Sequence, residues 1–118
     1  MGYVLHQNKW NWGRYEIIVI FDGFALCKVS VENDDPSIAW LSDVVVFEAM
    51  RHLGLGNRLS DIAMVRAMKM GAKKLGLWTD PKGWPLEWYK RRGFEYQYTD
   101  LNGQAVLEMD LEKHFNGR

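Results

Sequence analysis

A short segment with two glycines and two flanking arginines stands between residues 51 and 58, with the sequence RHLGLGNR. It follows a valine-rich run and precedes helix-forming residues, so we expect it to lead from a strand into a helix N-terminus. Gly54 and Gly56 would let a ligand approach the backbone closely, and the free amides and positive dipole end of the helix would bind phosphate oxygens. Arg51 and Arg58 would add positive charge.

Two common phosphate-binding loops do not fit this segment. A Walker A loop ends in Gly-Lys-Ser/Thr, which is absent here, and a dinucleotide fingerprint needs a third glycine where Leu59 stands. The segment taken alone therefore leaves two interpretations open, an ordinary tight turn and a phosphate-binding loop.

The basic charge of the chain is concentrated around this segment. The 118 residues have a formal net charge of zero, but residues 51–92 carry ten basic and three acidic side chains. A basic segment in a neutral protein favours a polyanionic ligand held at one place over nucleic-acid binding, which is typical of domains that are basic as a whole. A solvated helix face is the alternative explanation.

Composition indicates a single soluble domain over residues 1–118, with 47% apolar and 14% aromatic residues. No apolar run approaches the roughly 20 residues of a membrane-spanning helix. One cysteine, Cys27, and three histidines without ligand spacing predict neither a disulfide nor a metal site. We expect a cytoplasmic location and no membrane or nucleic-acid partner.

Three strands are predicted in the first half of the chain. Tyr15 to Phe21 and Phe24 to Val31 are rich in β-formers and are separated by Asp22-Gly23, a strong hairpin signal. Ile38 to Phe47 is the third strand, and its unbroken run of three valines predicts a central position with burial on both faces. Residues 1–14 carry no clear signal.

The second half alternates helices and strands. A helix is predicted from Asn57 to about Gly71, followed by a strand over Leu75 to Thr79 and a helix over Pro85 to Arg92. The apolar face of the first helix comprises Leu59, Ile62, Ala63, Ala67 and Met70, and the side chains expected on its opposite face are Asp61, Met64 and Met68.

The last predicted elements form a hairpin, Phe94 to Thr99 with Gln104 to Leu111. The third and fourth strands are joined by a helical crossover and should be parallel, while the other neighbours are antiparallel. The fold class is therefore α+β with a mixed sheet.

Two motifs together resemble the GNAT superfamily of acyl-CoA N-acyltransferases. Arg51-x-x-Gly54-x-Gly56 after a valine-rich strand is similar to that family's Q/R-x-x-G-x-G/A signature. About 40 residues downstream, the segment WYKRRGF at residues 88–94 is similar to its Tyr-x-x-x-Gly-Phe ending of the last helix. The resemblance implies a mostly antiparallel mixed sheet, with one parallel strand pair splayed around the cofactor and two main helices.

The resemblance also implies a site for acetyl-CoA as co-substrate, with no metal. The pantetheine arm would pair with the backbone of Val44, Val45 and Val46 like an added strand. The phosphates would lie against the glycine segment, whose residues are Arg51, His52, Leu53, Gly54, Leu55, Gly56, Asn57 and Arg58.

The implied reaction is attack of an amine on a thioester, which needs a base, a donor for the oxyanion and an acid for the leaving sulfur. Tyr89 matches the family's acid by position, and a packed tyrosine is the alternative. Asp43 is the first candidate for the base because it is the only carboxylate in the third predicted strand, although a carboxylate that caps a bulge would look the same. Asp80 is the second candidate, in a sequence equally typical of a plain turn.

The chain departs from the family pattern at two places. Many members have an asparagine seven residues before the tyrosine, where Lys82 stands. Members also insert two helices of about 30 residues between their first two strands, for which residues 1–14 leave no room. The acceptor side must then be open, closed by Trp10 and Trp12, or closed by another subunit. With Met64 and Met68 expected on a helix surface, we predict a homodimer.

Trp84 and Trp88 lie four residues apart and should share a face of the second helix, where core packing explains them. We expect an N-acetyltransferase that moves an acetyl group from acetyl-CoA to an amine, a small molecule or a protein. The alternative is a non-catalytic coenzyme-A-binding or interaction domain with the same fold.

Overall fold

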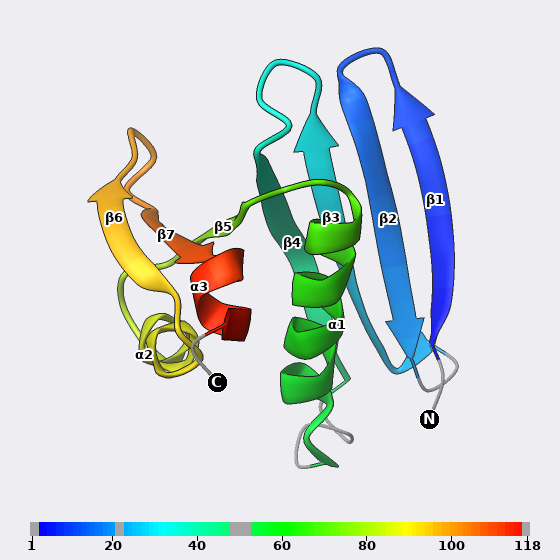
Figure 1. Cartoon of the computed structure of the whole chain (residues 1–118). Coiled ribbons are helices and arrows are strands. Elements are labelled where there is room, and N and C mark those ends of the chain that lie inside the picture. Colours follow the sequence, from blue (N-terminus) through cyan, green and yellow to red (C-terminus); the bar gives the residue numbers. More distant parts are fainter. Residues whose placement is uncertain (1–2, 21–22, 48–52, 117–118) are drawn as a thin grey trace.

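A seven-stranded mixed sheet with helices on one face is formed by the chain (Figure 1). The computed structural model describes residues 3–20, 23–47 and 53–116. The strand order is β1-β2-β3-β4-β5-β7-β6, and β4 with β5 is the parallel pair. The strands are β1 Val4–Trp10, β2 Gly13–Ile20, β3 Ala25–Glu32, β4 Ile38–Val46, β5 Lys74–Thr79, β6 Glu95–Thr99 and β7 Ala105–Asp110. The helices are α1 Leu55–Lys69, α2 Trp84–Arg91 and α3 Leu111–Asn116. The predicted α+β class with one parallel pair is confirmed.

The N-terminal residues form an edge strand, which the sequence did not reveal. β1 pairs with β2 along its whole length, and a two-residue turn, Asn11 and Trp12, connects them. β1 is almost entirely exposed, so it lacks the alternation of apolar residues that marks β2 and β3. The short turn stands where the GNAT pattern places two helices, as the length of this segment predicted.

β4 and β5 run side by side only at their first residues and then separate. Three register pairs join them, from Ile38 opposite Lys74 to Trp40 opposite Gly76. Beyond that point β5 no longer pairs with β4 among the described residues, and Val44 and Val45 are 36% and 42% exposed. The prediction that the valines are buried on both faces is therefore wrong. Once β5 has turned away, it no longer covers this part of β4.

An irregularity in β4 accompanies this separation. The register between β3 and β4 shifts between Leu26 and Lys28, where two residues of β4 oppose one of β3. Asp43 lies at this bulge with a φ of 54°, a left-handed conformation that is uncommon for residues other than glycine. A bulge bends its strand and interrupts the ladder, so it turns the C-terminal part of β4 away from its earlier course.

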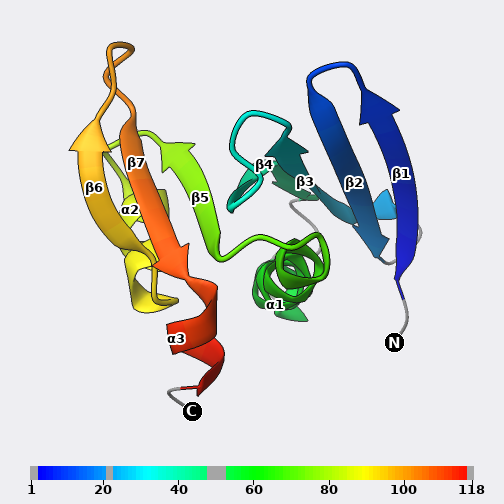
Figure 2. The ribbon, with the colours of Figure 1, turned by 45° about the horizontal axis from the view of Figure 1, so that its top comes forward.

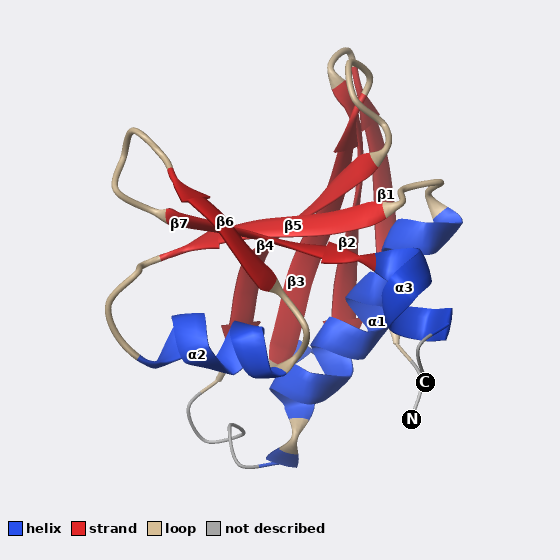
Figure 3. Cartoon of the chain, turned by 60° about the vertical axis from the view of Figure 1, so that its left-hand side comes forward, coloured by secondary structure: helices blue, strands red, loops and turns tan. Residues whose placement is uncertain are grey.

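The helices share one core with one face of the sheet. α1 packs against β3 (Figure 2). It lies where the two parts of the sheet, β1–β4 and β5–β7, meet at an angle and form a crease. Leu86 and Tyr89 of α2 and Leu111 of α3 join the same core, and Figure 3 shows the three helices on the same side of β5–β7. Among the helices of the described residues, none is long and apolar enough to cross a membrane.

The position of α1 corrects one expectation about its surface. Met64, expected on the exposed side, is buried in the core, while Met68 is exposed. Because α1 lies in a crease, sheet and neighbouring elements cover a wider arc of the helix than a single apolar stripe. Met64 therefore cannot form part of a surface contact with a second copy, and the homodimer stays a prediction.

A buried ion pair fixes α1 to the sheet. The Arg66 guanidinium donates from Nε and Nη2 to the two carboxylate oxygens of Glu16, at 2.6 and 2.9 Å. The side-chain amide of Gln7 donates to the same carboxylate at 2.9 Å. These donors favour the ionised form and hold the pKa of Glu16 below its usual value of 4.5.

We expect Glu16→Gln to lower the free energy of unfolding by about 1–2 kcal/mol at pH 7, because it removes the negative charge that accepts two hydrogen bonds from the partly buried Arg66 guanidinium. The pKa of Glu16 is lower in the folded state, so its contribution is present above pH 4.5 and is lost as the pH falls through the folded-state pKa. Urea denaturation at pH 7 and pH 3 should show a difference that shrinks in acid. Glu87→Gln, in an exposed pair with Lys90, is the control and should change stability by less than about 1 kcal/mol. An equal loss at both pH values would contradict this account.

Candidate active site

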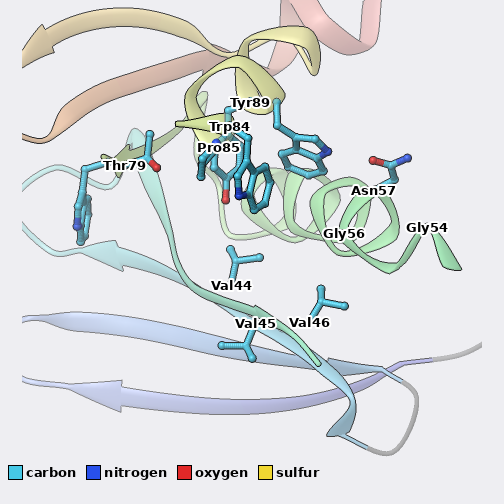
Figure 4. Close-up of a pocket in the computed structure, with 12 residues that line it drawn as sticks. Val44, Val45, Val46, Gly54, Gly56, Asn57, Thr79, Trp84, Pro85 and Tyr89 are labelled. Carbon is cyan, nitrogen blue, oxygen red and sulfur yellow. The ribbon is translucent and has the colours of Figure 1, made fainter. Parts of the chain in front are cut away.

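A cleft of about 770 Å³ occupies the gap where β4 and β5 separate (Figure 4). β4 forms one wall, α2 forms the opposite wall, and the N-terminus of α1 closes one end. Its lining residues are Val44, Val45, Val46, Gly54, Gly56, Asn57, Trp78, Thr79, Trp84, Pro85, Trp88 and Tyr89. The structure thus brings the three valines of β4, three residues of the glycine segment (Gly54, Gly56 and Asn57) and Tyr89 to the same cleft.

The α1 N-terminus in this cleft has no cap of its own. The capping position is Gly54, in the left-handed conformation with a φ of 75°, and it supplies no side-chain hydrogen bond to the helix. The first turn contains no acidic residue. The amides of this turn and the positive end of the helix dipole are therefore available to an anion.

The other residues of the glycine segment contribute differently. Arg51 and His52 lie outside the described residues. Leu53 is exposed, whereas the Leu55 side chain is buried in the core, so Leu55 can offer only its backbone amide to a ligand. Arg58 lies on the first turns of α1 and is not among the lining residues.

Gly56 faces the Trp88 side chain of α2. A Cβ atom at Gly56 would lie 3.4 Å from the indole ring, which is ordinary van der Waals contact. The Arg92 guanidinium lies over the same indole, 5.1 Å from the ring centre. Arg92 also donates a hydrogen bond to the side-chain oxygen of Asn57 at 2.5 Å. Arg92 also pairs with Asp61 at 3.6 Å. These contacts tie the end of α2 to the start of α1 and set the width of this end of the cleft.

The valines of β4 alternate across the sheet. Figure 4 shows Val44 and Val46 pointing toward α2 and Val45 pointing away from it. Among the described residues, β5 pairs with β4 only as far as Trp40 and has turned away before Val44. An extended ligand could therefore hydrogen-bond there as an additional strand does.

The end of α2 determines where Tyr89 lies. Gly93 adopts a φ of 104°, and the chain reverses so that the Phe94 amide donates back to the Tyr89 carbonyl at 3.2 Å. Phe94 is buried and meets the Tyr89 ring edge-to-face, with ring centres 5.7 Å apart. The glycine and phenylalanine of the second motif thus hold the tyrosine ring on the cleft wall.

The surroundings of Tyr89 keep its proton in place. Burial raises the pKa of the phenol above its usual value of 10, and the neighbouring Cys27 adds to this effect. Burial also raises the pKa of the Cys27 thiol to about 12. At neutral pH Tyr89 is therefore a proton donor, and Cys27 is an inert neutral thiol.

The two candidate bases lie beside the cleft and are already engaged. Asp43 is not among the lining residues, its side chain is 67% exposed, and its carboxylate pairs with Lys28 Nζ at 3.4 Å. Asp80 accepts a hydrogen bond from the Lys82 amide at 2.8 Å within its own turn. Among the described residues no group of His, Cys, Asp and Glu side chains could hold a metal ion.

Aromatic residues are placed differently from what the sequence indicated. Trp84 is 72% exposed at the cleft rim, so the prediction that core packing explains it is wrong, since α2 buries its other side. Trp78 lines the cleft, which no sequence motif indicated. Trp10 stacks on Tyr15 at the far edge of the sheet, where β2 and β3 separate its strand from β4, and neither Trp10 nor Trp12 lines the cleft.

The model of the acetyltransferase (GNAT) family matches residues 6–94. The chain belongs to the GNAT family. The matched span includes the splayed strands, the N-terminus of α1 and the Tyr89 segment. The resemblance that the two sequence motifs indicated is therefore confirmed. No curated protein sequence matches the chain significantly.

Solved structures agree with this family assignment at the level of the fold. A GNAT family acetyltransferase from Elizabethkingia anophelis with acetyl-CoA bound has a TM-score of 0.69 at 14% identity, over 92% of this chain and 97% of that one. A GNAT family acetyltransferase from Staphylococcus aureus has a TM-score of 0.66 at 15% identity, over 88% and 72%.

N-acetylglutamate synthase from Neisseria gonorrhoeae, complexed with coenzyme A and N-acetyl-glutamate, has a TM-score of 0.68 at 17% identity. That match covers 82% of this chain and 25% of the synthase. At these identities the likeness concerns the GNAT fold alone, while the family match supports acyl-CoA-dependent acyl transfer in general.

Proposed function

We propose that this GNAT protein transfers an acetyl group from acetyl-CoA to an amine by direct attack. The observation that carries the proposal is one cleft that joins three features of the described residues: the helix N-terminus at Gly54, the part of β4 that β5 does not pair with, and a protonated tyrosine. Each of these matches one part of an acyl-CoA molecule and its reaction: the phosphates, the amide-containing pantetheine arm and the departing sulfur.

Coenzyme binding would use backbone groups more than side chains. The pyrophosphate would lie at the first turn of α1, between Gly54 and Asn57, where amides and the helix dipole favour anions. The pantetheine arm would pair with β4 near Val44, beyond the last residue that pairs with β5. The ten basic side chains of residues 51–92 would add long-range attraction for a phosphate-rich ligand.

The chemical step forms a C–N bond and breaks a C–S bond. The uncharged amine nitrogen attacks the thioester carbon, and the carbonyl oxygen takes up the negative charge of the tetrahedral intermediate. A backbone amide of the bulged part of β4 would donate to that oxygen. As the intermediate collapses, the Tyr89 hydroxyl would donate its proton to the sulfur, which leaves as the thiol of coenzyme A.

Asp43 is the proposed acceptor of the amine proton. It is adjacent to Val44 on the bulge, on the strand that would hold the acyl group. Its side chain is exposed and lies 3.4 Å from Lys28 Nζ. The proton can pass onward to water from such an exposed position.

Coenzyme binding should depend on the absence of a large side chain at Gly56. Gly56→Leu should weaken the affinity for acetyl-CoA at least ten-fold, because the larger side chain would displace Trp88 at the end of the cleft. Gly56→Ala is the matched control and should stay within about three-fold, since its Cβ makes only ordinary contact. Isothermal calorimetry gives the affinities, and circular dichroism checks the fold. Absence of acetyl-CoA binding by the unaltered protein would overturn the proposed function.

Turnover should depend on the Tyr89 hydroxyl. Tyr89→Phe should lower kcat by about 10² to 10⁴ with little change in acetyl-CoA affinity, as expected for loss of a general acid. Because the pKa of Tyr89 is raised above 10, wild-type kcat should show no loss of this acid below pH 10 and should fall as the pH rises further. Tyr96→Phe, on the exposed strand β6, is the control. A ten-fold loss or less would assign Tyr89 a packing role.

For Asp43→Asn we expect a smaller effect, less than about ten-fold on kcat/KM, because the carboxylate is exposed and already paired with Lys28. A kcat/KM equal to that of the unaltered protein would exclude Asp43 as the base. Coenzyme binding without thiol release over a broad amine panel would favour the non-catalytic alternative.

A further inference from the structure

The cleft is lined by side chains from both faces of the sheet. On the helix face it meets α2 and the α1 N-terminus, the places proposed for the coenzyme. Leu77 of β5 is buried in the core on the helix face, and side chains alternate along a strand, so Trp78 projects from the opposite face. Trp78 and Val45 line the cleft from that second face. An acceptor that meets the thioester without displacing the coenzyme would therefore enter there.

A rigid aromatic surface borders this second opening. Trp40 lies across Gly76, where an added Cβ would come within 2.8 Å of its ring, so the glycine makes room for the indole. Trp78 packs on Trp40 with ring centres 5.7 Å apart and an interplanar angle of 52°. Trp78 is nevertheless 50% exposed. The side chain is thus held in place from one side and presents its other side to solvent.

The charges near this opening do not favour a polycation. Asp43 beside the opening is paired with Lys28, whose Nζ also lies 5.5 Å from the centre of the Tyr15 ring. Asp80, next to the lining residue Thr79, is engaged by the Lys82 amide. An acceptor with several positive charges would meet an ammonium and engaged carboxylates, whereas an apolar body would meet Trp78 and Val45.

Resting on the proposed function, we infer that the acceptor is an arylalkylamine, an amine joined by an alkyl chain to an aromatic ring. The ring stacks on the exposed side of Trp78, and the nitrogen reaches between β4 and β5 toward the thioester carbon. Aromatic pairs contribute about 0.5–1.5 kcal/mol beyond the area they bury, which corresponds to a preference of roughly two- to ten-fold over an alkylamine before area is counted. Burial of the ring adds to this preference.

The experiment compares amines at saturating acetyl-CoA, with thiol release as the signal. The amines are 2-phenylethylamine, tryptamine, n-propylamine and spermidine. We expect kcat/KM to be at least ten-fold higher for the two arylalkylamines than for the other two. Trp78→Ala should reduce that ratio to near one, mainly by raising KM, and Trp78→Phe should retain most of it. Trp10→Ala, an exposed tryptophan at the far edge of the same sheet, is the matched control and should leave the ratio unchanged.

The outcomes separate this inference from the proposed function. Failure to bind acetyl-CoA would overturn both. Binding of acetyl-CoA with equal or faster transfer to n-propylamine or spermidine, or with no transfer to any of the four amines, would overturn the acceptor assignment alone. A ratio that survives in Trp78→Ala would also overturn it. Light scattering completes the test, because a mass that falls in Trp78→Ala, with the ratio retained, would assign this surface to a second copy of the chain.

Discussion

The separation of β4 from β5 is the constraint on which the other features of the site depend. The two strands pair over three residues each, and the last pair is Trp40 with Gly76. The bulge at Asp43 then bends β4, and β5 does not pair with the later described residues of β4. A continuous ladder at this place would leave no opening between the faces of the sheet. The cleft is therefore a consequence of strand pairing that stops early.

The helices around the opening are positioned by contacts that link the two motifs to each other. The reversal at Gly93 brings Phe94 under Tyr89, and Arg92 and Trp88 meet Asn57 and Gly56 of α1. On its far side α1 is fixed to the sheet by the buried pair of Arg66 with Glu16. The two ends of α1 thus serve different purposes, since one carries a free N-terminus and the other carries the anchor.

Local patterns explain which parts of the fold could be predicted. The Asp22-Gly23 hairpin signal, the helix stop at Gly93 and the glycine segment depend on neighbours in sequence, and the elements around them were placed correctly. An apolar run does not say whether a neighbouring strand or a ligand covers it, so the valines of β4 were assigned the wrong surroundings. Met64 and Trp78 depend on a crease and a register set by distant segments, which periodicity within one element cannot show.

An unpaired strand edge normally invites other extended chains, and proteins blunt such edges to avoid aggregation. Here the edge of β4 that β5 leaves is short, bent by a bulge, and faced by the α2 wall. A second polypeptide strand brings side chains on both of its faces, which α2 would exclude. A slender arm that carries amides on an unbranched chain can enter. The limited space beside β4 therefore excludes a second polypeptide strand and admits a slender ligand.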